Sequence, residues 1–155
     1  EVFPETLPHG VKKLVSDDPV GEVKHMPPNS YYLVMTHNHQ LDFDLTKAII
    51  DREDSRYFGM IGSLTKRKKF DFRLEQRGYS QEQIETMVCP IGISTVNGKH
   101  PAEIAVSVAG ELIAHYQGQA LEQKRPTKQY QNQDLTDQHS QSSDVGEPPL
   151  EEKIA

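Results

Sequence analysis

Two short apolar runs without polar alternation constrain the fold of this chain more than any other feature. They are Tyr31–Met35 and Tyr57–Ile61. Runs of this length and composition suit strands that are buried on both faces, as in a parallel sheet. Each run is followed by a helical pattern, and a third, shorter strand candidate, Val88–Ile91, is followed by another. We therefore expect an α/β fold, in which a mainly parallel sheet carries helices on both faces.

Local signals predict the remaining elements. Val11–Val15 is a possible short strand, and residues 20–26 fit a short helix. Ser63 is the expected N-cap of a long helix, Gly78 is its expected C-terminal glycine, and the segment 80–83 fits a capping box. Pro101 opens the last helix, whose inward stripe is expected to be Ile104, Val108, Leu112 and Ile113.

Composition divides the chain at residue 117. Residues 118–155 contain seven Gln and only eight apolar residues, which follow no periodic pattern. Such a polar segment cannot bury enough apolar surface to offset the loss of chain entropy on folding. We therefore expect residues 1–117 to form the domain and residues 118–155 to form a disordered polar tail.

Charge, hydropathy and cysteine usage exclude several classes of protein. A net charge of −6 is typical of a protein that does not bind nucleic acid. No apolar run approaches the length that spans a membrane, and no secretory signal pattern is present. The single cysteine, Cys89, rules out an internal disulfide and a cysteine-rich metal site. It fits a reducing compartment such as the cytoplasm.

Ligands of parallel α/β sheets bind outside the carboxyl ends of the strands. The first polar segment expected there contains Thr36, His37, His39 and Asp42. Two histidines and a carboxylate can ligate a metal or transfer protons near neutral pH. Asp42 stands one residue too late for the His-x-His-x-Asp-His signature of metallo-hydrolases. Contact with a ligand in a pocket is therefore the favoured interpretation, and a purely structural loop is the alternative.

The second polar segment follows the second apolar run and reads Gly62-Ser63-Leu64-Thr65-Lys66-Arg67. Gly62 would let the backbone approach a ligand closely, and the free N–H groups of the new helix favour an anion. Ser63 and Thr65 offer hydroxyls, whereas Lys66 and Arg67 offer positive charge. Two interpretations of this segment have about equal support: a phosphate site, and a capped basic helix that is simply solvated. The segment does not match a P-loop.

The third polar segment follows Cys89 and includes Gly92 and Lys99. Cys89 follows apolar residues, so an inert buried thiol is the favoured reading over a role in sulfur transfer. Lys99 lies near a helix N-terminus, where a positive charge is unfavourable for the helix and an anionic partner would compensate for it.

These segments resemble the motifs of the XdhC/CoxI family. Leu33–Asp42 is similar to its Thr-His-x-His-x-x-Asp element, and Tyr57–Arg67 to its Gly-x-Ile-Gly-Ser-x-x-Lys element. Cys89–Ile93 and Lys99–Ala109 resemble its Cys-Pro-Ile-Gly and Lys-x-Pro-x-Glu-Ile-Ala elements. The motifs occur in the family's order over about residues 1–117, and their order and spacing make the resemblance specific.

The resemblance implies a Rossmann-like domain in a protein that helps to mature molybdenum hydroxylases such as xanthine dehydrogenase. Family members bind the molybdenum cofactor, favour its sulfuration by a cysteine desulfurase and deliver it to the apoenzyme. The implied partners are therefore a molybdenum hydroxylase apoenzyme and a cysteine desulfurase, and the implied role is that of a chaperone rather than an enzyme. The candidate cofactor-binding residues are Thr36, His37, His39, Asp42, Gly62, Ser63, Lys66, Arg67, Gly92 and Lys99.

The sequence also departs from the family pattern. The family's Rossmann domain begins with a Gly-x-Gly-x-x-Gly strand–turn–helix, and this sequence contains nothing of that form. Lacking the first βαβ portion, the sheet is expected to expose an edge and an apolar patch. The chain could then be a fragment, one product of a split gene, or a protein that completes its core through a partner or as a homodimer. An NAD(P)-dependent oxidoreductase and a ligand-free interaction module are the alternative functions.

Overall fold

The computed structural model describes residues 4, 6–96 and 98–119 of the chain. The polar tail that we predict for residues 118–155 therefore lies, from residue 120 onward, outside the described residues. None of the helices in the described ranges is long and apolar enough to cross a membrane.

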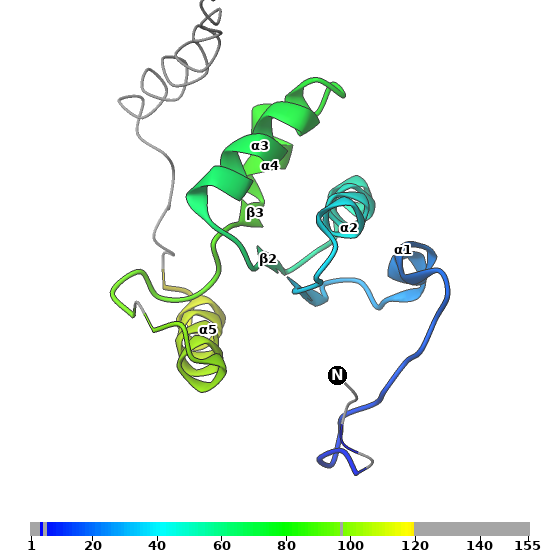
Figure 1. The fold of residues 1–155 in the computed structure, drawn as a ribbon. Coiled ribbons are helices and arrows are strands. Elements are labelled where there is room, and N and C mark those ends of the chain that lie inside the picture. Colours follow the sequence, from blue (N-terminus) through cyan, green and yellow to red (C-terminus); the bar gives the residue numbers. More distant parts are fainter. Residues whose placement is uncertain (1–3, 5, 97, 120–155) are drawn as a thin grey trace, which may run out of the picture. The chain divides into compact units, whose positions relative to one another are not determined.

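The described elements alternate between helix and strand, as the sequence predicts (Figure 1). Three parallel strands form one sheet in the order β1-β2-β3, with Tyr31 opposite Tyr57 and Phe58 opposite Met87. The elements in chain order are α1 (Pro19–Glu22), a 3-10 turn η1 (Val23–His25), β1 (Tyr31–Val34), α2 (His39–Arg52), β2 (Tyr57–Met60), α3 (Leu64–Glu75), α4 (Gln81–Glu85), β3 (Met87–Val88) and α5 (Pro101–Tyr116).

The strand predicted at Val11–Val15 is wrong. This segment has no strand structure, and its apolar side chains Val11, Leu14 and Val15 are 55%, 57% and 78% exposed. A strand needs a neighbour for its backbone hydrogen bonds, and no described strand lies beside this segment. The third strand also differs from the prediction: it begins at Met87 and has only two residues, and Pro90, just beyond it, cannot donate a backbone hydrogen bond to a sheet.

The predicted helix ends are confirmed. The Ser63 side chain accepts a hydrogen bond from the backbone N–H of Lys66, as an N-cap does. Ser80 and Gln83 form a complete capping box at α4. Gly78 follows α3 with a φ angle of 85°, in the left-handed region that glycine favours. The cap of α2 is Asn38, whose side chain accepts hydrogen bonds from two backbone N–H groups.

One face of the sheet is closed by α2, α3 and α4. Side chains alternate along a strand, so Tyr32, Val34, Phe58 and Met60 share this face and join one apolar cluster. The helices contribute buried partners to that cluster, and the most deeply buried of these are Phe43, Ile49, Leu74 and Ile84.

The opposite face of the sheet carries α5. The Tyr57 hydroxyl donates a hydrogen bond to Glu111 of α5, and Tyr31 contacts His115 of the same helix. The predicted inward stripe of α5 is partly wrong: Val108 is buried, whereas Ile113 is 57% exposed. The buried positions of α5 include polar Ser107 and Glu111 instead, which an apolar pattern cannot detect.

Candidate functional site

The ends of β1 and β2 bring two of the predicted polar segments into contact. The Lys66 Nζ atom lies 2.6 Å from Asp42 Oδ2 and donates a second hydrogen bond to the backbone carbonyl of Ile61 at 2.9 Å. Lys66 belongs to the first turn of α3, and Asp42 to the first turn of α2. This ion pair therefore joins the two helices where their strands end.

Asp42 is the most buried member of this cluster, with a fully buried side chain. Its Oδ1 atom accepts hydrogen bonds from the Thr36 hydroxyl at 2.6 Å and from the Thr36 backbone N–H at 3.2 Å. A buried carboxylate needs a cation and hydrogen-bond donors to offset its lost hydration, and Lys66 and Thr36 provide them. Thr36, Asp42 and Lys66 thus form one unit, which we call the strand-end cluster.

The two predicted basic residues of the second segment have different surroundings. The Lys66 side chain is 10% exposed, so its charge is largely compensated by Asp42. Arg67 is 4% exposed and donates hydrogen bonds to the carbonyl oxygens of Met87 and Ile84 and to the carboxylate of Asp71. The prediction that Arg67 offers its charge to an anion is therefore wrong, because its guanidinium ties α3 to α4 and β3.

The two glycines at the strand ends are required by the protein's own packing. A Cβ atom on Gly62 would lie 2.7 Å from Cδ of Lys66 and 3.3 Å from Sγ of Cys89. Gly92 has a φ angle of 97°, and a Cβ atom there would lie 2.6 Å from the Ser107 hydroxyl. Close approach of a ligand is therefore not needed to explain either glycine.

The exposed part of the site is the turn that leads into α3. Gly62, Ser63, Leu64 and Thr65 are all exposed, whereas Lys66 behind them is largely buried. The first N–H groups of a helix have no partner within the helix, and here Ser63 caps only the N–H of Lys66. Two backbone donors and two hydroxyls are thus presented to solvent at the positive end of a helix dipole, a donor set that suits an anion.

The two predicted histidines lie on the surface at the start of α2. His37 is exposed in the loop after β1, and His39 is exposed at the start of α2. Within the described ranges, no group of three His, Cys, Asp or Glu side chains is arranged to hold a metal ion. Contact of either histidine with a ligand stays a prediction.

The third predicted segment makes its contacts through backbone N–H groups rather than through charged side chains. The N–H of Gly92 donates to Glu111 Oε1 at 3.2 Å, and the N–H of Ile93 donates to the Ser107 hydroxyl at 2.7 Å. Two buried polar residues of α5 therefore fix the loop that follows β3. Lys99 is exposed and forms no ion pair with any residue that the structure describes.

This loop begins at a buried cysteine, directly after β3. Cys89 is 2% exposed, and burial raises the pKa of its thiol to about 11. A thiol in this state is a weak nucleophile near neutral pH. This supports the interpretation of Cys89 as an inert buried thiol over a role in sulfur transfer.

A buried hydrogen bond that the sequence pattern does not predict joins Tyr57 of β2 to Glu111 of α5. The Tyr57 hydroxyl donates to Glu111 Oε1 at 2.5 Å, and this oxygen also accepts from Gly92. Burial and the bond to Glu111 raise the pKa of Tyr57 well above its ordinary value. The sequence offered one indication of this contact: Glu111 lies among apolar residues of the last helix. A carboxylate at a buried position requires a hydrogen-bond donor.

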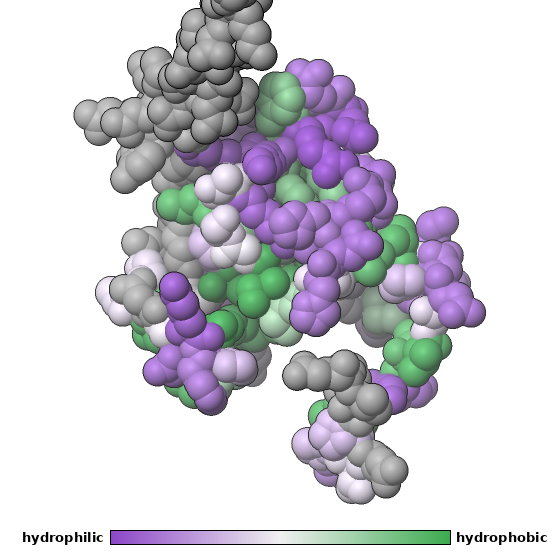
Figure 2. All heavy atoms as spheres, viewed as in Figure 1, coloured by the Kyte–Doolittle hydropathy of each residue, from purple (hydrophilic) through white to green (hydrophobic). Residues whose placement is uncertain are grey.

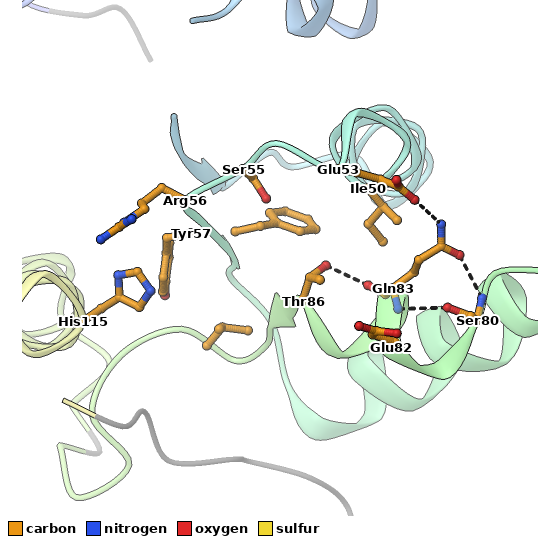
Figure 3. A pocket seen from close by; sticks show the side chains of 12 residues that line it. Ile50, Glu53, Ser55, Arg56, Tyr57, Ser80, Glu82, Gln83, Thr86 and His115 are labelled. Carbon is orange, nitrogen blue, oxygen red and sulfur yellow. Dashed lines mark hydrogen bonds between the residues drawn. The ribbon is translucent and has the colours of Figure 1, made fainter. Parts of the chain in front are cut away.

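One hollow of the surface lies at the other end of the sheet. It has a volume of about 800 Å³ and is lined by residues that begin β2, such as Ser55 and Arg56, and by Thr86, which precedes β3. Figure 3 shows Arg56 and His115 on one side of it and Glu53 and Gln83, joined by a hydrogen bond, on the other. The candidate cofactor-binding residues do not line it.

Comparison with known protein families identifies the family of the chain. The XdhC Rossmann domain family matches residues 4–112, which is well over half of the sequence. The chain belongs to the XdhC Rossmann domain family. The matched range contains the strand-end cluster, the exposed turn at Gly62–Thr65 and the loop at Gly92, so all three polar segments belong to the XdhC domain. No curated protein matches the chain.

Proposed function

We propose that this XdhC-like protein is an accessory protein that binds the molybdenum cofactor and helps to insert its sulfurated form into xanthine dehydrogenase-like hydroxylases. The observation that carries the proposal is the family match over residues 4–112, which spans three polar segments that follow consecutive strands of one sheet. In a parallel sheet, ligands bind outside the carboxyl ends of the strands, which is where these segments lie.

The exposed turn at Gly62–Thr65 suits the phosphate of such a cofactor. Its free backbone donors and its two hydroxyls lie at the N-terminus of a 12-residue helix. The strand-end cluster behind it acts as a rigid support, because Lys66 binds both Asp42 and the end of β2. The bound group would supply the molybdenum and its dithiolene, whereas this chain would supply only binding and orientation.

Delivery to an apoenzyme and sulfuration by a cysteine desulfurase are the partner interactions of this proposal. A buried Cys89 with a raised pKa is unsuited to carry the sulfur itself. We therefore propose that the desulfurase acts on the cofactor while the protein holds it.

Substitution at Thr65 tests the binding site. Thr65→Glu places a carboxylate in the first turn of α3, where the helix dipole tolerates it but a phosphate would be repelled. We expect the purified chain to bind molybdenum cofactor released from a molybdenum enzyme, and we expect Thr65→Glu to weaken that binding at least tenfold.

A matched control separates repulsion from a general charge effect. Gln81→Glu makes the same change of charge at an exposed position in the first turn of α4. It should bind the cofactor like the wild type. Equal losses in both variants, or no binding by the wild type, would contradict the proposal. Binding of NADPH but not of the cofactor, followed by fluorescence, would favour the oxidoreductase instead.

A further inference from the structure

The hollow beside the starts of β2 and β3 has the size of a ligand site, and we call it the strand-start pocket. Its volume of about 800 Å³ lies within the range of about 300–1,000 Å³ that is usual for pockets that bind small molecules. Its walls come from α2, β2, α4, β3 and α5 and from the loops between them. Of the described residues that line it, none belongs to β1 or to the three polar segments at the strand ends.

The base of the strand-start pocket is apolar. Ile50 and Phe58, which are 4% and 1% exposed, are among its most deeply buried lining residues, and Val88 and the ring of Tyr57 lie beside them. The surface is different elsewhere: in the view of Figure 2, hydrophilic side chains cover α3. A concave apolar base favours a ligand with an apolar or aromatic body, because such a body removes this surface from water.

One wall of the pocket carries hydrogen-bond donors that the fold does not use. Within the described ranges, the Arg56 guanidinium and the Ser55 hydroxyl have no hydrogen bond or ion pair. His115 approaches from the same side (Figure 3), and its Nδ1 atom contacts the Tyr31 hydroxyl at 3.3 Å, so its Nε2 atom remains available to a ligand. A guanidinium presents its N–H groups as a planar fork that matches the two oxygens of a carboxylate. This wall therefore suits a carboxylate.

The opposite wall carries acceptors. The carboxylates of Glu53 and Glu82 line it, and the Gln83 side chain donates to Glu53 Oε1 at 2.9 Å (Figure 3), which leaves the other oxygen of Glu53 available. The hydroxyls of Ser80 and Thr86 are already bonded to the backbone of Gln83. An ionised carboxylate only accepts hydrogen bonds, so this wall favours a hydroxyl or an amine and repels a second anion.

We propose that the strand-start pocket binds a small organic molecule with a carboxylate at one end, an apolar body, and a hydroxyl or amine at the other end. The carboxylate pairs with Arg56 and His115, the body covers the apolar base, and the hydroxyl or amine donates to Glu53. The turn at Gly62–Thr65 takes no part in this site, so the inference does not depend on the proposed function.

Three related probes test the chemistry of the site, with their binding to the purified chain followed by NMR titration. We expect 4-hydroxyphenylacetate to bind saturably at one site. Its amide, 4-hydroxyphenylacetamide, should bind about tenfold more weakly or worse, because it loses the charge-assisted bonds to Arg56. Phenylacetate lacks the hydroxyl that donates to Glu53 and should bind about threefold more weakly or worse.

Two variants and a matched control locate the site. Arg56→Gln should weaken binding of 4-hydroxyphenylacetate by about tenfold or more and change binding of the amide little. Glu53→Gln keeps an acceptor for Gln83 but has no second acceptor oxygen, so it should remove the preference for 4-hydroxyphenylacetate over phenylacetate. Lys69→Gln makes the same change of charge as Arg56→Gln at an exposed position of α3 and should bind all three probes like the wild type.

Three results would overturn the proposal: no saturable binding of 4-hydroxyphenylacetate, an amide that binds as tightly as the acid, or equal losses in Arg56→Gln and Lys69→Gln. Circular dichroism should show that all variants are folded. Because the two sites are separate, a chain that binds molybdenum cofactor but none of the probes would contradict this inference alone. A chain that binds the probes but not the cofactor would contradict only the proposed function.

Discussion

The two faces of the sheet are built by different means. On the α2–α3 face, Phe43, Met60 and Leu74 are fully buried in one apolar cluster. On the α5 face, contact with the sheet rests on polar groups, chiefly Tyr57 and Glu111, and Tyr31 beside them is 40% exposed. No α5 residue in the described part of the chain belongs to the central apolar cluster.

This difference predicts which face contributes most to the stability of the fold. The closed face removes apolar surface from water and supplies most of the folding free energy. The α5 face leaves apolar side chains of β1 and α5 exposed, among them Tyr31 and Ile113, and an exposed side chain contributes little to the free energy of folding. We therefore expect substitutions on the closed face to affect unfolding strongly and those at exposed positions of α5 to affect it weakly.

The largest effect is expected from Phe43→Ala. Phe43 is fully buried, packs edge-on against Phe70 at 5.1 Å between ring centroids, and lies under the Arg73 guanidinium at 3.7 Å. Removal of a buried ring from a core typically costs about 3–5 kcal/mol. We expect a loss of this size in the free energy of unfolding, measured with urea.

Val106→Ala is the counterpart of that substitution on α5. Because Val106 is 71% exposed, it should change the free energy of unfolding of the monomer by less than about 0.5 kcal/mol. Similar losses from the two substitutions would show that the faces do not differ as we describe.

Lys66→Met tests the strand-end cluster and should have the next largest effect. The substitution leaves the fully buried Asp42 without its cation, and breaking one side of a buried pair typically costs about 3–5 kcal/mol. Thr36 still donates to Asp42, so we expect the lower end, about 3 kcal/mol, by urea unfolding. Lys69→Met, at an exposed position of the same helix, should cost almost nothing; a similar cost would contradict the role of the pair.

Sequence patterns predicted the fold well where a local rule decides the structure. The apolar runs at Tyr31 and Tyr57 became β1 and β2, and Ser63 and Ser80 became the predicted caps. These features depend on neighbours within four residues, which the sequence shows directly. The strand at Val11–Val15 failed because a strand also needs a neighbour in space.

The sequence predicted which polar segments follow the strands, but it did not predict the contacts of their side chains. Lys66 and Arg67 are equivalent in the sequence, yet Lys66 reaches Asp42 while Arg67 turns toward Met87 and Ile84. Successive helical residues point about 100° apart, and only the packing of α4 decides which one is buried. Glu111 was missed because its partners lie on β2 and in the loop after β3.

Alkaline pH should weaken the polar contact of the α5 face. Burial raises the pKa of Tyr57 above its ordinary value of 10.0, so the folded state retains a proton that the unfolded state releases. The stability from this group is complete below about pH 10 and is lost as pH rises further. Tyr57→Phe should cost about 1–2 kcal/mol at pH 7 and give a flatter decline in stability above pH 10.

Urea unfolding at several pH values measures this prediction, with Tyr116→Phe as the control. Tyr116 is 80% exposed, so its variant should follow the wild type at every pH. The raised pKa of Tyr79, about 12, and of Cys89, about 11, act in the same direction and remain in all three proteins. A Tyr57→Phe profile parallel to that of the wild type would refute the assignment to Tyr57.

The smallest effect is expected from Tyr32→Phe, and its sign is the informative part. Tyr32 packs against the central cluster, and its buried hydroxyl has no hydrogen-bond partner among the described residues. An unsatisfied buried hydroxyl costs about 1–3 kcal/mol, so its removal should leave stability unchanged or raise it by up to about 1 kcal/mol. Tyr57→Phe makes the same chemical change on the opposite face and should destabilise. If both substitutions lowered the urea midpoint equally, the Tyr32 hydroxyl would have a partner, and the closed face would depend on polar contacts as the α5 face does.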